Sequence, residues 1–194
     1  MRIIAGSSKG KTLLSPPEAT RPTSDRAREG LFSSLESEFG SMNDLAFLDL
    51  FTGSGAVGVE ALSRGAASVY AVEQHEATAN VARKNFELVN SPDGDFAVIN
   101  SSVEGFLISP GLPKGFTFDI IFMDPPYPMP NEEIEKILRT IYENGLLANR
   151  GLIAIERESR SKPFAWPEPF IAEKIRSYGQ GSIFYGGLPA SVLP

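Results

Sequence analysis

The chain has 194 residues, a formal net charge of −6, no cysteine and one histidine, and this length suits one α/β domain with a sizeable core. Without cysteine there is no disulfide, thiolate metal site or cysteine nucleophile, and a single histidine argues against a multi-histidine site, so no metal is expected. No apolar run reaches membrane-spanning length and no signal-peptide pattern follows Met1, which indicates a reducing, cytoplasmic setting.

Positive charge is concentrated at the amino terminus. Residues 1 to 28 carry six basic and two acidic residues, so the remaining residues carry a net charge of −10. The six basic residues are Arg2, Lys9, Lys11, Arg21, Arg26 and Arg28. We expect a flexible, basic arm over residues 1–20 and a single domain over residues 21–194. Such an arm would suit a phosphate backbone, although a solvated leader with no special role is the alternative.

Residues 24–39 form the first predicted helix, because Ala27, Leu31 and Leu35 recur at four-residue spacing. Its first turn contains Arg26 and Arg28, which oppose the helix dipole. Cations in this unfavourable position indicate an external anion, so we predict a phosphate-facing entrance to the catalytic cleft. Chance placement is the competing interpretation.

A glycine loop follows the first apolar strand. Gly53, Gly55 and Gly58 form a G-x-G-x-x-G pattern, which permits a tight turn and close approach of a ligand to the main chain. The pattern equally fits a dinucleotide-binding fingerprint, with Glu73 at a suitable distance to hold a ribose. Asp49 favours the cationic donor S-adenosylmethionine, because a carboxylate would lie unfavourably beside a pyrophosphate. A helix cap is the other interpretation of Asp49, disfavoured by the intervening glycine turn.

Apolar, β-rich runs alternate with helical patterns along the rest of the chain. The runs cover residues 46–51, 68–73, 96–100, 118–123 and 151–156. Their alternation with helices predicts a parallel, doubly wound sheet with right-handed crossovers. A hairpin predicted over residues 170–178 and 182–185 suits a seven-stranded methyltransferase sheet better than a plain dinucleotide-binding domain. Asp49, Glu73 and Asp124 fall at strand ends, where such sheets bind ligands, so we predict the active site there.

The segment Asp124-Pro125-Pro126-Tyr127 ends the fourth apolar run and holds a carboxylate, a stiff backbone and an aromatic ring close together. Two prolines fix φ at consecutive positions and keep Asp124 extended. The carboxylate and nearby carbonyls can accept hydrogen bonds from an exocyclic amine while Tyr127 stacks on the ring. The segment therefore indicates a flat, amino-bearing ring such as a nucleobase, with an ordinary strand-ending turn as the alternative.

With these motifs, the chain resembles the bacterial 16S ribosomal RNA (guanine-N2-)-methyltransferases that modify the small subunit. The resemblance spans nearly the whole chain and rests on residues 2–6, 9–11, 21–26 with 28–29 and Phe32, 48–55 and 124–127. It implies a Rossmann-like class I methyltransferase fold, with a mostly parallel seven-stranded sheet and a C-terminal antiparallel hairpin. It further implies S-adenosylmethionine as donor, S-adenosylhomocysteine as product, and one guanine of 16S rRNA, in small subunits or their assembly intermediates, as acceptor. We expect a monomer with no membrane partner.

The resemblance also implies roles for particular residues. Cofactor binding would involve Asp49, Phe51, Gly53, Ser54, Gly55, Glu73, Gln74, Ser102, Val103 and Asp124. Catalysis would involve Asp124, Pro125, Pro126 and Tyr127. RNA binding would involve Arg2, Lys9, Lys11, Arg21, Thr23, Arg26 and Arg28. Ser102 stands where such proteins often place an Asp near the adenine of the cofactor, and its hydroxyl can still accept a hydrogen bond.

Three alternatives remain open at the level of sequence. Adenine or a protein glutamine fits the same motif, because the motif reports a planar amine or amide and only the resemblance selects guanine. An NAD-dependent oxidoreductase would share the glycine loop. A non-catalytic RNA-binding assembly factor would keep the basic arm but should lose residues 124–127, which are intact.

Overall fold

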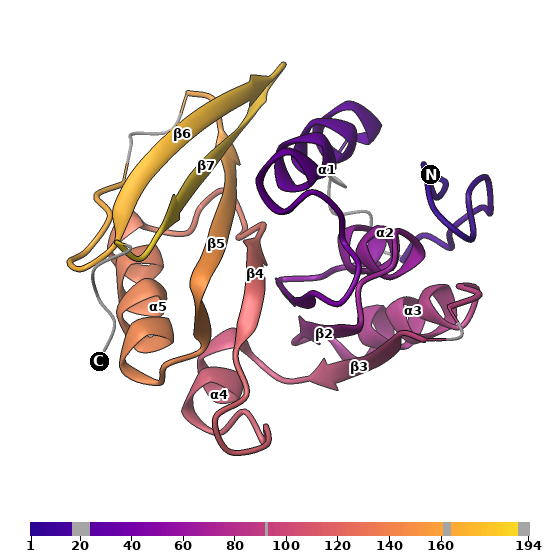
Figure 1. Cartoon of the computed structure of the whole chain (residues 1–194), viewed down its shortest axis with the longest axis horizontal. Helices are drawn as coiled ribbons and strands as arrows, with labels where there is room; N and C mark the ends of the chain where they lie inside the picture. Colours follow the sequence, from indigo (N-terminus) through magenta and orange to yellow (C-terminus); the bar gives the residue numbers. More distant parts are fainter. Residues whose placement is uncertain (17–23, 92, 161–163, 190–194) are drawn as a thin grey trace.

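The computed structural model describes residues 1–16, 24–91, 93–160 and 164–189, in which one twisted sheet lies between two layers of helices (Figure 1). Five parallel strands come first, namely β1 (Ala46–Leu50), β2 (Ser68–Glu73), β3 (Asp95–Asn100), β4 (Phe118–Met123) and β5 (Leu147–Glu158). An antiparallel hairpin of β6 (Ile171–Tyr178) and β7 (Gly181–Gly187) completes the sheet in the order β3-β2-β1-β4-β5-β7-β6. The mostly parallel seven-stranded sheet and its C-terminal hairpin confirm the predicted fold class.

The helices cover both faces of the sheet. On one face lie α1 (Asp25–Phe39), α2 (Ala56–Ser63) and α3 (Glu76–Phe86), and on the other lie α4 (Val103–Ile108) and α5 (Asn131–Glu143). Central strands are consequently buried on both sides. In β1, Phe47 packs in the core between the sheet and helices α1–α3, which we call the first core. Leu48 packs in the core between the sheet and helices α4 and α5, the second core, which explains an uninterrupted apolar run rather than an alternating one. None of the helices in the described residues is long and apolar enough to cross a membrane.

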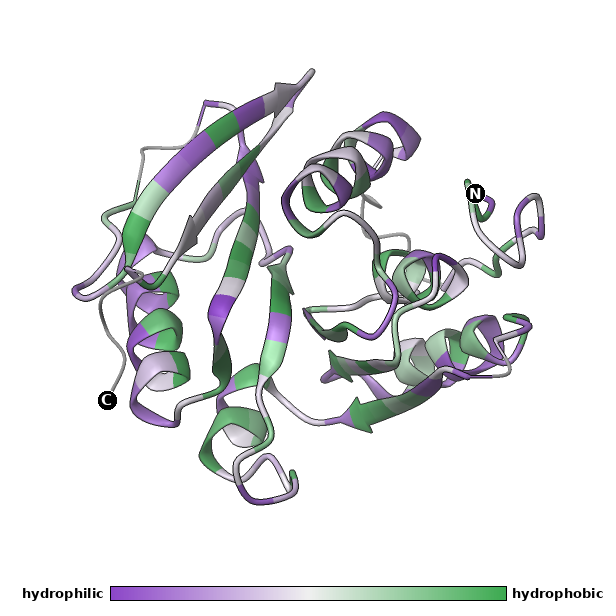
Figure 2. Cartoon of the chain, in the orientation of Figure 1, coloured by the Kyte–Doolittle hydropathy of each residue, from purple (hydrophilic) through white to green (hydrophobic). Residues whose placement is uncertain are grey.

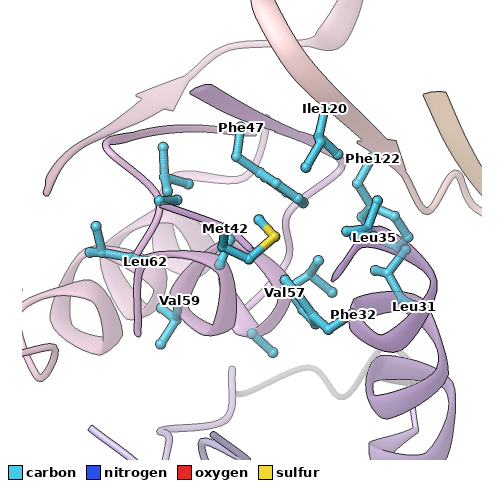
Figure 3. Packing of buried hydrophobic residues seen from close by; sticks show 14 of the residues in the cluster. Leu31, Phe32, Leu35, Met42, Phe47, Val57, Val59, Leu62, Ile120 and Phe122 are labelled. Carbon is cyan, nitrogen blue, oxygen red and sulfur yellow. The ribbon is translucent and has the colours of Figure 1, made fainter. Parts of the chain in front are cut away.

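Helix α1 begins where the sequence predicts, because the Ser24 hydroxyl accepts a hydrogen bond (3.1 Å) from the backbone N–H of Ala27. Its apolar face enters the first core, where the rings of Phe32 and Phe47 stack with centroids 6.3 Å apart. Figure 3 shows this packing, in which residues of α1 meet Phe122 of β4. This packing of α1 against β1 and β4 holds the helix over the carboxyl ends of the central strands.

The C-terminal hairpin lies on the other side of the carboxyl ends of the central strands (Figure 1). Figure 2 shows hydrophobic residues along the central strands and a mixed pattern on the outermost strand, β6. Trp166, on the segment that enters the hairpin, packs between Phe164 and Phe170 with ring centroids 5.2 and 6.3 Å away. Trp166 is therefore a packing residue.

Residues 1–16 are docked on the domain, which corrects the expectation of a flexible arm for this part of the chain. Ile3 and Leu13 are buried in the first core. The carboxylate of Glu60, on α2, accepts hydrogen bonds from the backbone N–H groups of Ile4 (2.8 Å) and Ala5 (2.9 Å). Because Glu60 is itself fully buried, these bonds hold the segment against α2 rather than in solvent.

Candidate active site

A cavity of about 550 Å³ lies at the carboxyl ends of the central strands. This volume is typical of pockets that enclose a small molecule. Four carboxylates from consecutive strands line it: Glu73 of β2, Asp49 of β1, Asp124 after β4 and Glu156 of β5. Helix α1 and the β6–β7 hairpin stand on either side of these strand ends (Figure 1). The structure thus brings the three acidic residues singled out in the sequence into one cavity.

Asp49 is 1% exposed, and its Oδ2 accepts hydrogen bonds from the hydroxyl of Thr52 (2.5 Å) and the N–H of Gly58 (3.0 Å). Gly58 lies in the first turn of α2, so Asp49 caps that helix across the glycine turn. The interpretation as a cap, disfavoured at the level of sequence, is therefore correct. Burial raises the pKa of Asp49 to about 7, and the charge of Glu73 adds to this rise. Oδ1 is buried and accepts no hydrogen bond within the described part of the chain.

The glycine turn departs from ordinary backbone geometry at Phe51, which has φ of 63° and lines the cavity. A non-glycine residue in this region is uncommon and often marks a functional constraint. The N–H of Thr52 donates to the carbonyl of Val72 (2.9 Å), which holds the turn against β2. Gly53 and Ser54 reach the cavity wall, whereas Gly55, at the N-terminus of α2 with φ of 81°, is absent from the described lining.

Glu73 ends β2 and is 7% exposed. Its Oε2 accepts the N–H of Gly53 (3.0 Å) and its Oε1 accepts the N–H of His75 (2.9 Å). One carboxylate therefore joins the glycine turn to the start of α3 and keeps its remaining lone pairs beside the cavity. Gln74 and His75 are exposed and also line this end of the cavity.

Ser102 lies at the N-terminus of α4, next to the cavity. Its hydroxyl accepts the N–H of Gly105 (3.0 Å) and caps α4. Among the described residues, the neighbours Ser101 and Val103 line the cavity and Ser102 does not. The Ser102 hydroxyl therefore caps the helix, and its contact with the adenine of the cofactor stays a prediction.

Residues 124–127 form the wall beyond β4. Asp124, Pro125, Pro126 and Tyr127 all line the cavity, and Tyr127 is 40% exposed. The N–H of Asp124 donates to the carbonyl of Leu50 (3.4 Å), so the segment leaves the sheet beside the glycine turn. Arg157 of β5 donates from Nη2 to the carbonyl of Met129 (3.0 Å), which ties down the chain after the motif.

Arg28 is not available to RNA, which corrects its predicted role. Its side chain is fully buried, and Nη2 donates to the carbonyl of Arg2 (2.9 Å) and pairs with Asp25 (2.6 Å). Arg2, Lys9 and Arg26 are exposed, in keeping with a surface role. Lys11 is also exposed and donates to the carbonyl of Leu88 (2.6 Å). Arg21 and Thr23 lie outside the described residues.

Two parts of the cavity were not predicted. Glu156 ends a predicted strand, so the rule that found Asp49, Glu73 and Asp124 could also have found Glu156. The hairpin turn contributes Tyr178 and Gly181, and the amino-terminal segments contribute Met1, Ser15, Pro16 and Ser24. These contacts depend on how distant elements pack, and no local pattern signals them.

Comparison with known proteins places the chain in a family. The family model described as "Conserved hypothetical protein 95" matches residues 1–186. The chain is 37% identical to the ribosomal RNA small subunit methyltransferase D of Escherichia coli over 159 residues, covering 81% of this chain and 75% of the relative. It is 35% identical to the protein of the same name from Haemophilus influenzae over 180 residues, covering 92% and 89%.

A solved structure agrees with these relatives. The Escherichia coli protein yhhF superposes with a TM-score of 0.79 at 31% identity, covering 96% of each chain. The chain therefore belongs to the family of the ribosomal RNA small subunit methyltransferase D proteins, which have the class I methyltransferase fold.

Proposed function

We propose that this protein transfers a methyl group from S-adenosylmethionine to the exocyclic N2 amine of a guanine in 16S rRNA of the small ribosomal subunit. The observation that carries the proposal is the position of residues 124–127, which share one cavity with the glycine turn and with Asp49 and Glu73. The predicted donor site and the predicted acceptor motif thereby line the same cavity, which supports direct group transfer. Membership of the family supports ribosomal RNA as the substrate.

The donor end of the cavity fits a cationic nucleoside. When bound, S-adenosylmethionine supplies an electrophilic methyl group on a positively charged sulfur. Glu73 can accept hydrogen bonds from ribose hydroxyls, while Gly53 and Ser54 let the ligand approach the main chain. The buried Oδ1 of Asp49 offers an acceptor for a donor such as an ammonium group. A positive ligand would also hold Asp49 ionised, because it counters the burial that raises the pKa of this carboxyl.

The residues at the acceptor end of the cavity can raise the reactivity of an exocyclic amine. Such an amine is a poor nucleophile because its lone pair is delocalised into the ring. The carboxylate of Asp124 and the carbonyl of Pro125 can accept its two hydrogens and favour a pyramidal nitrogen. As the N–CH₃ bond forms and the S–CH₃ bond breaks, Asp124 stabilises the positive charge on nitrogen and can take up the proton. Tyr127, partly exposed at the cavity wall, can stack on the base.

The RNA backbone has a matching surface. Arg2 and Lys9 share a small hollow with Asp25 and Glu29 of α1, and Arg26 is exposed on the first turn of the same helix. Residues of the same segments, Met1 and Ser24, line the cavity. Three exposed cations, Arg2, Lys9 and Arg26, therefore lie on segments that border the cavity, where they can bind the phosphates that flank a flipped nucleotide.

Radiolabelled methyl transfer tests the proposal. The enzyme is incubated with labelled S-adenosylmethionine and three acceptors: unmethylated small subunits, naked 16S rRNA and bulk protein. After digestion to nucleosides, the label is expected in N2-methylguanosine derived from the rRNA. Label in methyladenosine or methylglutamine would contradict the guanine assignment, and no transfer to any acceptor would contradict the activity itself.

A further inference from the structure

Glu156 lies at the acceptor end of the cavity, on the far side of Asp124 from the donor site. The order of the strands sets this arrangement: β2, β1, β4 and β5 are neighbours, so Glu73 and Asp49 come first, Asp124 next and Glu156 last. Glu156 is 8% exposed and lines the same cavity. The donor occupies one end in the proposed function, which leaves Glu156 facing the base.

The register of β4 and β5 brings Asp124 and Glu156 next to each other. Met123 pairs with Ile155, and Asp124 and Glu156 are the residues that follow. Adjacent strands lie about 4.7–4.9 Å apart. Ala154 and Phe122 belong to the first core, whereas Ile155 and Met123 belong to the second. Because side chains alternate along a strand, Glu156 points to the same side of the sheet as Ala154, toward α1, and Asp124, the first residue after β4, lines the same cavity.

The side chain of Glu156 lies against the start of β7. A Cβ atom on Gly181, at the start of β7, would come within 2.9 Å of its Oε1, so the glycine leaves room for the carboxylate. Tyr178, also in the cavity wall, packs directly on Gly30 of α1. The hairpin turn and α1 thus enclose a carboxylate and an aromatic ring at the acceptor end.

A second carboxylate beside the reacting amine selects among nucleobases. In adenine the exocyclic amine is next to N1, and in cytosine it is next to N3; both are bare acceptors that a carboxylate would repel. In guanine the N2 amine is next to N1–H, a donor. Enzymes that flip a base read it through such hydrogen bonds to its Watson–Crick edge. Two adjacent carboxylates therefore match the N2–H and N1–H of guanine.

We propose that Glu156 accepts the N1–H of the target guanine and so sets the base specificity of the enzyme. The inference rests on the proposed function, because it assumes methyl transfer at the end of the cavity formed by Asp124. Glu156 is then a specificity-determining residue, and it needs no part in moving the methyl group or the proton.

A base analogue distinguishes this role from a merely structural one. Small subunits are reconstituted with 16S rRNA carrying either guanine or 2-aminopurine at the methylated position. 2-Aminopurine keeps the amine at C2 but has a bare N1. The wild-type enzyme should prefer guanine by at least about 10-fold in kcat/KM, since a hydrogen bond to a charged group contributes about 1.5–3 kcal/mol. In Glu156→Gln the amide can donate to the bare N1, so this preference should fall by about 10- to 100-fold.

Glu158→Gln is the matched control, because Glu158 is exposed two residues further along β5 and should keep the wild-type preference. An equal loss on both substrates in Glu156→Gln, with the ratio unchanged, would overturn the inference and leave the proposed function standing. The wild-type arm needs no variant, so a failure of Glu156→Gln to fold does not remove the test. Equal wild-type activity on both bases overturns the role of Glu156, and wild-type label in adenine overturns both proposals.

Discussion

At the scale of single residues, the carboxylates that line the cavity differ in their contacts. Asp49 is buried and caps α2, Glu73 joins two backbone turns, and Asp124 stands at the end of β4 beside two prolines. The sequence predicted all three residues, because each lies within two residues of the end of an apolar run in a parallel sheet. The RNA-binding role predicted for Arg28 was wrong. A charged residue is expected to be exposed unless a buried partner is known, and the carbonyl that Arg28 binds, at Arg2, is 26 residues away in the sequence.

Replacing Asp124 should separate chemistry from cofactor binding. In Asp124→Asn the side chain keeps one acceptor oxygen but loses its charge and its ability to take a proton. We expect kcat to fall by about 10²–10⁴-fold, the range typical of a lost general base. The dissociation constant for S-adenosylhomocysteine, measured by calorimetry, should change by less than about threefold. Wild-type turnover in this variant would refute the role of Asp124.

The raised pKa of Asp49 predicts a pH dependence of stability in the unliganded protein. Its pKa is about 7 in the folded chain, against an ordinary value of 3.8, so the folded state binds a proton that the unfolded state releases between these values. The free energy of unfolding contributed by this group is therefore fully present below about pH 4 and is lost as the pH rises through 7. In Asp49→Asn, which keeps a capping oxygen, the decline between pH 5 and 8 should be smaller.

Thermal unfolding at several pH values, with and without ligand, measures this effect. A cationic ligand should favour ionised Asp49, so S-adenosylmethionine should bind more tightly at pH 8 than at pH 6 in the wild type. Asp49→Asn should bind more weakly at pH 8 and lose most of this pH dependence. Identical pH profiles for the two proteins would show that Asp49 does not titrate in this range.

At the scale of elements, periodicity predicted the strands and the first helix well. Residues 118–123 match β4 at both ends, and α1 begins one residue after the predicted Ser24. β5 begins at Leu147, four residues before the predicted Gly151, because Asn149 and Arg150 are exposed and interrupt the apolar run. The docking of residues 1–16 could not be predicted, since it depends on Glu60, which lies 56 residues from Ile4.

Arg28 should act as a structural residue of α1. Replacing it with alanine removes a large, fully buried side chain and the bond that joins α1 to the carbonyl of Arg2. We expect the free energy of unfolding to fall by about 2–4 kcal/mol, as for other large-to-small changes in a core. Arg26→Ala, at an exposed position on the same turn, should change it by less than about 0.5 kcal/mol. Urea unfolding compares the two, and equal effects would contradict the assignment.

At the scale of the whole molecule, an acidic body carries a basic edge. The net charge is −6, yet Arg2, Lys9 and Arg26 are exposed on the segments that border the cavity. These three cations form what we term the basic edge. The acidic body can limit non-specific binding to RNA, while the basic edge can direct phosphates to the cavity. The whole molecule thus combines weak non-specific attraction to RNA with a local surface that can bind phosphates.

The salt dependence of binding to small subunits tests the role of the basic edge. Each lost phosphate contact lowers the slope of log K against log salt by about 0.7–0.9, so alanine at all three positions should flatten it by roughly 2–3. Binding to small subunits between 50 and 200 mM salt, a window of about fourfold, provides the measurement. The matched control removes three other exposed cations, Lys114, Arg139 and Arg150. An equally flattened slope in the control would show that the basic edge has no special role.

A crystal structure of the protein with S-adenosylhomocysteine bound tests the arrangement of the cavity most directly. We expect the ribose hydroxyls at Glu73, the ligand's main-chain contacts at Gly53 and Ser54, and the sulfur directed toward Asp124 and Pro125. A ligand bound outside the cavity, or with its sulfur directed away from the two prolines, would contradict the proposed transfer.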